Sequence, residues 1–430
     1  MSNLPARFEE SECWELFYQC IDHVGVEFKS YVPVKVTQSQ IEGIAVRLIA
    51  DQRLGFSSTT DLSQIEEAID AARSAARLGL PTRIEFPPPA HYVPVESFDP
   101  QVASMVGDQL KDWIARDIQR GHLSRVRNLT VVAERDVITR RIFNHRGLDV
   151  ADQSTILKVK VCGCFSDGFD LLTESEISRQ FDIDLEKLVE RFRRRYDRCR
   201  NSKLARMLRG RLPAIISENS MRSLLGELER MLVRIVNLSD RGLLKRLRDL
   251  QLASPTVTLI DKGTGNWLPG SASFDDEGVA KQNITIIERG QLKTPILDLY
   301  PASLLGEQPT GHAWRRGVNF RPVARFNYPC LSPGSDTREQ ILSDLREGLF
   351  IDQLRNIELG GKALGDFTAK VKLGFSVRNG SLSELVRDYR IAGNLFRLLG
   401  DHLIAIADCP ESCSRGSVPA VMVKEIEVQT

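Results

Sequence analysis

One stretch of the sequence, residues 270–317, constrains the fold most, because it concentrates charged residues beside chain-breaking ones. Three consecutive acidic residues open it and a glycine follows them directly: Asp275, Asp276, Glu277 and Gly278. Two arginines, Arg315 and Arg316, end it after a Pro-Thr-Gly sequence. Glycine and proline beside charged residues mark turns with special backbone geometry. The stretch is therefore predicted to begin with an acidic loop and to end with a basic loop.

Between the two loops the sequence predicts a β-hairpin. Residues 284–287, Ile-Thr-Ile-Ile, form a short apolar run that is typical of a buried strand. The turn at 288–291 contains Gly290, which can adopt a positive φ, and residues 292–297 are expected to return as the second strand. The pattern leaves two interpretations open, a hairpin with a purely structural role and an element that contacts a charged ligand.

Chain length and composition favour two domains. The chain has 430 residues, of which 42% are hydrophobic, so it can form more than one core. We predict an α+β fold with two domains. Residues 1–208 are expected to form an N-terminal domain of helix-plus-antiparallel-sheet units, and residues 209–430 a mixed, β-rich C-terminal domain.

The N-terminal domain is predicted to begin with an amphipathic helix at residues 7–22, because Trp14, Phe17 and Tyr18 recur at helical spacing. Residues 44–49 are expected to form a strand. A second helix is predicted from Asp61, which has capping-box spacing, to the Gly-Leu-Pro sequence at 79–81.

A second unit of the same kind is expected to follow a proline-rich linker at residues 85–90. Helices are predicted near 101–119 and 184–199. Strands are predicted between them, near 128–134, 137–143 and 155–165.

Charge and hydropathy bear on the location of the chain. The net charge is +1, which gives the whole molecule no electrostatic preference for nucleic acid or a membrane surface. The first twenty residues lack a long apolar segment of the kind found in secretory signals, and no run reaches the ~18 apolar residues of a spanning helix. We therefore expect a soluble, cytoplasmic chain with no membrane association.

Residues 187–211 are the one strongly basic segment, with arginines at its centre. Such a segment can bind nucleic acid, or it can be the solvated face of a helix. Aromatic residues are sparse within it, and the acid-rich residues 166–190 can offset its charge. Nucleic acid binding is therefore the less favoured interpretation.

The sequence contains no local metal-binding motif. No two of the six histidines lie three, four or five residues apart, so no adjacent pair on a helix can hold a metal ion. Of the eight cysteines, Cys409 and Cys413 are the only pair in loop-like surroundings, and no histidine is near them in sequence. Reduced cysteines without a metal are expected.

Several motifs, taken in order along the chain, resemble those of the TldD/TldE (PmbA) family, also labelled modulator of DNA gyrase. In the stretch at 270–317 they are the sequences FDDEGV, IIERGQL and YPASLLGEQPTGHAWRR. Others lie at residues 54–63, 144–147, 365–367 and 377–380. One departure is His312, which stands where the family commonly has an asparagine.

The resemblance implies where a zinc site would be. In the catalytic TldD branch, a helix near the start of the second domain carries H-E-x-x-x-H, whose histidines bind zinc while the glutamate acts as base. Here Gly226 and Met231 occupy the two histidine positions, and only Glu227 is retained. The helix is expected to turn its leucines, among them Leu228, inward and to leave Glu227 in solvent. Cys413 lies near the position of a further cysteine ligand of the family.

The chain thus resembles the TldE (PmbA) branch. The resemblance implies a non-catalytic subunit that binds no cofactor itself and pairs with a TldD-like zinc metalloprotease chain. Such a heterodimer would cleave short, unfolded or modified peptides. The residues expected near peptide or partner are Asp275, Asp276, Glu277, Arg315 and Arg316. Whether this chain has activity of its own is left open.

Two alternatives stay open. The first is an independent enzyme whose site is assembled from distant residues, such as Cys413 with His312 or His402. The second is a nucleic-acid-binding regulator that uses residues 187–211.

Overall fold

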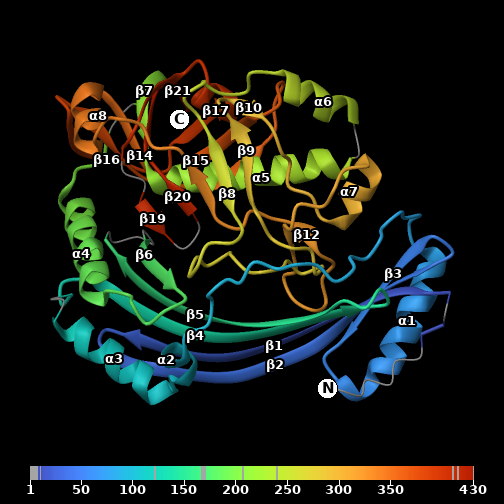
Figure 1. The fold of residues 1–430 in the computed structure, drawn as a ribbon. Helices are drawn as coiled ribbons and strands as arrows, with labels where there is room; N and C mark the ends of the chain where they lie inside the picture. The colour runs from blue at the N-terminus through green and yellow to red at the C-terminus, as the bar shows by residue number, and fades with distance from the viewer. Residues whose placement is uncertain are drawn as a thin grey trace. The chain divides into compact units, whose positions relative to one another are not determined.

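A computed structural model describes most of the chain. The described residues are 8–9, 11–120, 123–165, 171–205, 208–238, 241–408, 411–413 and 416–429. Their helices and strands follow one another as in Figure 1. They form two compact units, and the chain passes between these more than once. The first unit comprises Met1–Asp197, Gly263–Gln282 and Ile296–Arg325, and the second comprises Arg198–Lys262, Asn283–Pro295 and Phe326–Thr430.

The predicted α+β class is confirmed, since helices and several sheets occur in the same chain. The predicted boundary at 208/209 stays a prediction. The compact units do not follow from any single cut of the sequence, because two segments of the C-terminal half group with the first unit.

The first unit is built on a six-stranded antiparallel sheet with the order β3-β2-β1-β4-β5-β6. Its strands are long, and β1, β2 and β4 are the longest (Figure 1). The bounds are β1 Cys13–Lys29, β2 Val32–Ala50, β3 Arg53–Thr59, β4 Arg127–Asn144, β5 Asp149–Cys164 and β6 Leu171–Ser178.

The predicted helix at residues 7–22 is wrong, because most of this segment belongs to β1. Strand β1 is central and pairs with both β2 and β4. Three successive residues, Leu16, Phe17 and Tyr18, are buried, so both faces of the strand are covered. A strand that is apolar on both faces loses its alternation, and its aromatic residues then imitate helical spacing.

Other predictions for this unit are confirmed in part. Helix α1, Ile65–Leu78, buries the expected apolar stripe against β2 and β3. Its approach to β3 requires Gly55, where an added Cβ would lie 1.9 Å from the carbonyl oxygen of Ala72. Helices α2, Pro100–Ser104, and α3, Gly107–Arg120, contact the same sheet. The two strands predicted at 128–134 and 137–143 are one strand, β4.

Three short elements from later in the sequence complete the first unit. Helix α7, Leu299–Leu305, is capped by Asp298, and β11, Ala313–Trp314, pairs with β12, Val323–Ala324. Helix α4, Leu185–Asn201, begins in this unit and ends in the second.

The second unit contains a barrel-like sheet. Strand β14 pairs in parallel with β7 and antiparallel with β15, which closes the path β14-β7-β21-β17-β15, and β16 and β18 add to it. The bounds are β7 Gly210–Ile216, β14 Gly348–Leu359, β15 Asp366–Arg378, β16 Ser381–Val386, β17 Arg390–Asn394, β18 Leu403–Ile406 and β21 Val421–Gln429.

A smaller sheet in the second unit has the order β10-β9-β8-β13-β20-β19. The predicted hairpin is present as β9 and β10, with Gly290 at a φ of 83°. The returning strand stops after Leu292 and does not reach residue 297. The bounds are β8 Leu259–Lys262, β9 Asn283–Glu288, β10 Gln291–Leu292, β13 Pro329–Leu331, β19 Glu411–Cys413 and β20 Gly416–Val418.

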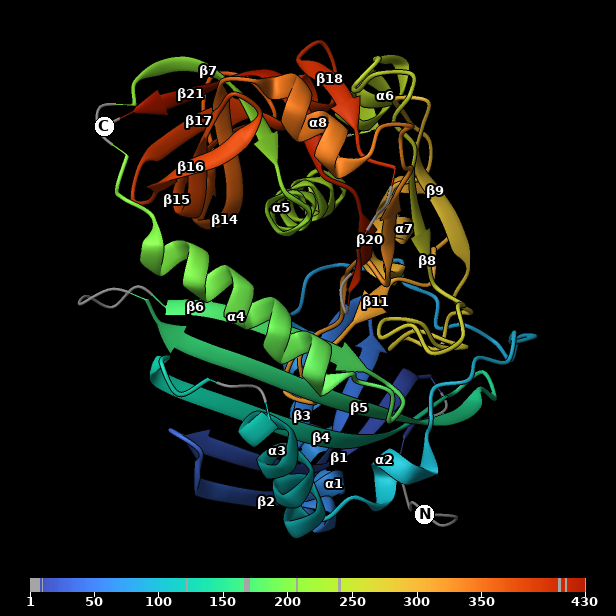
Figure 2. The same cartoon turned by 90° about the vertical axis from the view of Figure 1, so that its left-hand side faces the viewer.

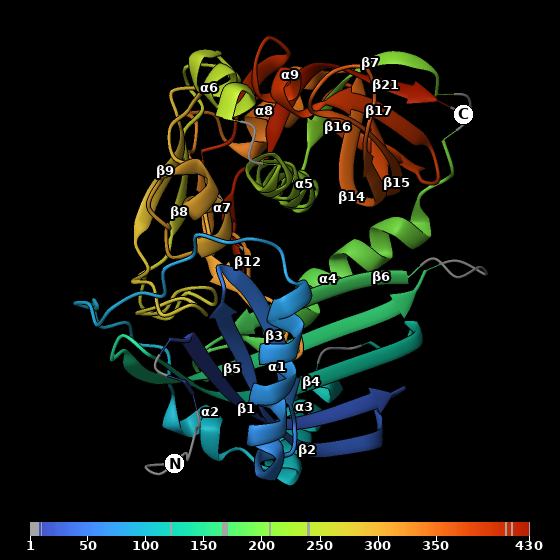
Figure 3. The same cartoon turned by 90° about the vertical axis from the view of Figure 1, so that its right-hand side faces the viewer.

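Helix α5, Glu218–Asn237, lies beside β14 in the second unit (Figures 2 and 3). The other helices are α6 Arg241–Asp249, α8 Arg338–Leu345 and α9 Leu395–Leu399. Among all the helices in the described part of the chain, none is both long and apolar enough to cross a membrane.

Candidate functional site

The acidic loop is buried rather than exposed. The residues Asp275, Asp276 and Glu277 are all at most 3% exposed. Asp275 holds the loop together, because its Oδ1 accepts hydrogen bonds from the backbone N–H groups of Glu277 at 2.9 Å and Val279 at 3.0 Å. The turn is completed by Gly278 at a φ of 78°. This loop is therefore a fixed structural element of the first unit.

Asp276 joins the loop to the long strands. One carboxylate oxygen accepts a hydrogen bond from Arg140 of β4, and the other accepts the backbone N–H of Arg315 at 2.6 Å. The Arg140 guanidinium also binds Asp152 of β5 through two nitrogens. Asp276 thus connects two strands with the segment that follows β11.

Glu277 makes a second connection, to β1 and β2. Its Oε1 pairs with Arg47, and its Oε2 accepts the backbone N–H of Leu299 at 2.7 Å. Arg47 in turn binds both carboxylate oxygens of Glu15. The side chain of Arg315 donates to the same Glu15 at 2.7 Å. We call Glu15, Arg47, Arg140, Asp152, Asp275, Asp276, Glu277, Asp298 and Arg315 the acid–arginine cluster.

The acids of the cluster outnumber its arginines, and this affects their protonation. Burial, and then the charge of Glu277, raises the pKa of Asp275 and also that of Asp298. Burial lowers the pKa of the Arg315 guanidinium, which stays cationic over the physiological range. The cluster therefore favours a proton on its excess carboxyl groups while its arginines remain paired.

The structure changes the interpretation of the residues expected to contact a peptide or partner. Asp275, Asp276, Glu277 and Arg315 are buried and bonded inside the first unit, so they present no surface to a second molecule here. Arg316 is exposed, and its guanidinium lies 5.4 Å from the ring centroid of Phe320. The contact role stays a prediction that only Arg316 can fulfil directly in this conformation.

Five members of the cluster were not identified from the sequence: Glu15, Arg47, Arg140, Asp152 and Asp298. A signal was present at Arg47, which interrupts the apolar run at residues 44–49. A charged residue inside a buried strand requires a partner. The sequence does not say which of the many acids that partner is.

Helix α5 carries the second set of predicted site residues. Its N-cap is Ser217, whose side chain accepts a hydrogen bond from the backbone N–H of Ser220. The expected inward leucines are confirmed, and Leu228 is 3% exposed. Glu227 is buried, so the expectation of a solvated carboxylate is wrong, and it pairs with Arg230 one turn later.

The residues of α5 do not fit a zinc ion. Gly226 has no side chain, and Met231 is a buried thioether rather than an imidazole. The carboxylate of Glu227 accepts a hydrogen bond from Arg230 and forms an ion pair with it. Among the described residues, no group of three or more His, Cys, Asp or Glu side chains is arranged to hold a metal ion.

The site named for an independent enzyme, Cys413 with His312 or His402, stays a prediction. His312 is buried in the first unit, and its Nδ1 lies 2.7 Å from the carbonyl oxygen of Thr310. His402 belongs to the second unit, where it contacts Arg397. The side chain of Cys413 and the whole of Cys409 lie outside the described residues.

The basic segment at 187–211 falls mainly on α4, and several of its arginines are paired with acids. Arg191 binds Glu174 and Glu176 of β6, and Arg195 binds Glu174 as well. Arg194 pairs with Glu190 on the helix itself. These pairs reduce the free positive charge that a nucleic acid would require.

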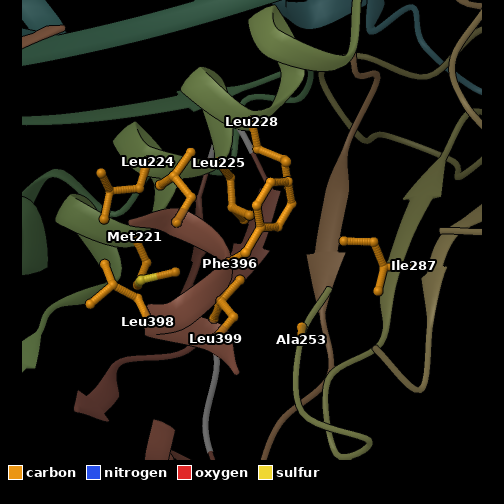
Figure 4. A pocket seen from close by; sticks show the side chains of 10 residues that line it. Met221, Leu224, Leu225, Leu228, Ala253, Ile287, Phe396, Leu398 and Leu399 are labelled. Carbon is orange, nitrogen blue, oxygen red and sulfur yellow. The ribbon is translucent and has the colours of Figure 1, made fainter. Parts of the chain in front are cut away.

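A small apolar pocket adjoins α5 in the second unit (Figure 4). Its free volume is about 10 Å³, roughly enough for one water molecule. It is lined by Met221, Leu224, Leu225, Leu228, Ala253, Ile287, Leu395, Phe396, Leu398 and Leu399. The lining offers no polar side chain to orient a ligand, so the pocket is a packing defect of the core.

The fold and these two regions define a two-unit α+β protein whose second unit sets a helix beside a barrel. Residues 209–430 match the family model described as PmbA/TldA metallopeptidase C-terminal domain, and residues 14–76 match PmbA/TldA metallopeptidase domain 1. The chain belongs to the PmbA/TldD family.

Relatives and solved structures agree with this assignment. A metalloprotease of Methanocaldococcus jannaschii is 31% identical over 150 residues, which are 35% of this chain and only 33% of that protein. An uncharacterised protein of the same organism is 26% identical over 83% of this chain and 82% of its own length. TldE from Thermococcus kodakarensis is 19% identical with a TM-score of 0.80, over 97% of each chain. A solved structure from Thermotoga maritima is 21% identical with a TM-score of 0.82, over 97% of this chain and 96% of that one.

Proposed function

We propose that the chain is a TldE-like, non-catalytic subunit of a cytoplasmic, heterodimeric zinc metalloprotease. Its partner would be a TldD-like chain that carries the zinc ion and cleaves short, unfolded or modified peptides. This chain would complete the cavity in which the peptide binds and would stabilise the catalytic chain. It would bind no metal or other cofactor itself.

The observation that supports the proposal best is the chemistry of α5. The resemblance assigns the family's zinc motif to this helix, which retains Glu227, yet Gly226 and Met231 provide no ligand. Glu227 is neutralised by Arg230 rather than left available as a base. A buried glutamate paired with arginine is stable without a metal, whereas a general base needs a free lone pair.

The partner half of the proposal is tested by reconstitution. The full chain is co-expressed with an HExxxH-bearing relative, and the two are co-purified through a tag on one chain only. We expect a one-to-one complex whose interface buries roughly 2,000 Å² or more, as obligate interfaces do. Neither chain alone should digest an unfolded peptide efficiently, and the mixture should.

A matched control separates partner effects from chance activation. The relative is mixed with an unrelated protein at the same concentration, and peptide digestion is followed by mass spectrometry. A relative that is fully active alone, and unchanged by this chain, would defeat the proposal. A Cys413→Ser variant that abolished activity of this chain alone would instead favour the independent enzyme.

A further inference from the structure

The hairpin formed by β11 and β12 has two different faces. Ala313 pairs with Ala324, and both are buried, whereas Trp314 pairs with Val323, and these are 39% and 47% exposed. Directly opposed residues of an antiparallel pair lie on the same face, and alternate residues along a strand lie on opposite faces. Trp314 and Val323 therefore form one outward-facing pair. The hairpin's place is marked by β12 in Figure 1 and β11 in Figure 2.

Three buried acids fix the inner side of this hairpin. The backbone N–H of Ala313 donates to Asp275 at 2.9 Å, and that of Ala324 donates to Asp298 at 3.0 Å. The backbone N–H of Arg315 donates to Asp276 at 2.6 Å. The backbone of the hairpin is therefore fixed by three hydrogen bonds, which also fix the positions of its outward-facing side chains.

Arginines stand at both ends of the outward pair. Arg325 follows Val323 by two residues on the same face, and its backbone N–H bonds the carbonyl oxygen of His312, which continues the ladder. Arg316 follows Trp314 by two residues in the other direction along the hairpin. Successive residues of one face of a strand are about 6.6 Å apart, which sets the distance of Arg325 from Val323, whereas Arg316 lies in the bend that follows β11.

These arginines are positioned by aromatic rings rather than by acids. The guanidinium of Arg325 lies 4.4 Å from the ring centroid of Trp314, and that of Arg316 lies 5.4 Å from Phe320. Within the described part of the chain, no carboxylate lies at ion-pair distance from either of them. Cation–π contacts hold a guanidinium in place and leave its N–H donors free.

We propose that the outer face of this hairpin binds an extended peptide that carries acidic residues on both sides of an apolar residue. In an extended peptide, residues i, i+2 and i+4 share a face and span about 13 Å. An apolar side chain at i+2 would pack on Trp314 and Val323. Carboxylates at i and i+4 would accept paired hydrogen bonds from Arg325 and Arg316.

The inference rests on the proposed function only in taking the occupant to be a peptide. A nucleic acid strand is the less suitable occupant, because its planar bases would have to stack on the aromatic rings, whereas a single apolar side chain can also pack on Val323. Guanidinium groups already cover one face of the Trp314 and Phe320 rings, which limits base stacking. The net charge of +1 gives no general attraction to a polyanion either.

The test measures binding of a blocked, fluorescent peptide, Glu-Ser-Leu-Ser-Glu, to the full purified chain by fluorescence anisotropy. The isomer Glu-Glu-Leu-Ser-Ser has the same composition with both acids on one side, and a five-residue thymidine oligonucleotide represents nucleic acid. We expect the first peptide to bind at least tenfold more tightly than the isomer or the oligonucleotide. Equal binding of the isomer, or tighter binding of the oligonucleotide, would overturn the inference.

Variants locate the binding on the chain. The double variant Arg316→Ala with Arg325→Ala should weaken binding of the first peptide at least tenfold. Trp314→Ala should remove the preference for leucine over serine at the central position of the peptide. The matched control is Arg193→Ala with Arg200→Ala, which removes the same charge from exposed positions of α4. A similar loss in both double variants would mean non-specific charge attraction and would contradict the inference. Because binding is measured without the partner chain, failure here leaves the co-purification result unaffected.

Discussion

The acid–arginine cluster and helix α5 both bury acidic residues, but they neutralise them in different ways. In the cluster, Glu277 is paired with Arg47, a residue 230 positions away in the sequence, and the side chains of both are almost fully buried. On α5, Glu227 is paired with Arg230, three positions later, and that arginine is 68% exposed. The first arrangement joins distant segments, whereas the second satisfies a single side chain.

This difference has an energetic consequence. Removing one member of a fully buried pair leaves an uncompensated charge, which is strongly destabilising. Removing an exposed member costs little, because water replaces it. The same kind of ion pair is therefore a structural joint in the cluster and a minor feature of α5.

The largest effect is expected for Arg47→Met. The variant leaves both Glu15 and Glu277 buried without their shared cation, so the free energy of unfolding should fall by roughly 3–5 kcal/mol. Urea denaturation followed by circular dichroism measures it. The control is Arg141→Met, because Arg141 pairs with Asp149 at the surface, and a loss below about 1 kcal/mol is expected there. Equal losses in the two variants would remove the distinction drawn above.

The next effect is expected in the apolar side of α5. Leu228→Ala removes a buried side chain beside the small pocket of Figure 4, which the variant would enlarge. The expected loss is roughly 2–5 kcal/mol. Leu238→Ala, at an exposed position just after the helix, should change stability by less than about 0.5 kcal/mol. A neutral Leu228→Ala would show that this face of α5 is not packed as described.

The cluster should also make stability depend on pH. The pKa of Asp275 and of Asp298 is raised in the fold above the usual value near 3.9, so the folded state binds more protons than the unfolded state. Between about pH 4 and neutral pH, the free energy of unfolding should therefore decrease as pH rises. Each group contributes at most about 1.4 kcal/mol per pH unit.

The pH effect is checked by urea denaturation at several pH values, in wild type and in Asp298→Asn. The variant loses stability overall, because an amide nitrogen then faces a backbone N–H of Tyr300 or Ala324. The comparison therefore uses only the slope of the free energy of unfolding against pH, which should be smaller in the variant. An unchanged slope would mean that Asp298 does not titrate in this range.

The smallest effect is expected for Arg230→Ala. Its guanidinium is mostly in solvent and water can replace it, but Glu227 is buried, so the loss of the pair should cost roughly 1–2 kcal/mol. A loss of stability as large as that of Arg47→Met would show that the ion pairs of the two regions contribute equally to stability. Thermal unfolding monitored by circular dichroism is sensitive enough to separate these outcomes.

The sequence predicted elements whose signals are local. Helix α1 was expected from its apolar stripe and its stop at Gly79, and α5 from its leucines. Strand β1 was mistaken for a helix, because its burial comes from β2 and β4 on either side and not from its own periodicity. Pairs such as Arg47 with Glu277 could not be predicted, because no local pattern selects one distant acid among many.

The candidate site, like the fold, was predicted from the sequence only in part. The sequence drew attention to Asp275, Asp276, Glu277 and Arg315, which the structure places in one cluster, but their contact with a peptide or partner stays a prediction. Burial could not be inferred, because a run of charged residues is usually solvated. Arg316 differs from Arg315 only by alternation along the chain, which turns one residue inward and the next outward.

The most direct test of the central claim is the zinc content of the purified, tag-free chain, measured by elemental analysis after dialysis against metal-free buffer. Because Gly226 and Met231 provide no ligand and Glu227 is paired with Arg230, the chain is predicted to hold no stoichiometric zinc. About one tightly bound zinc ion per chain would contradict the account.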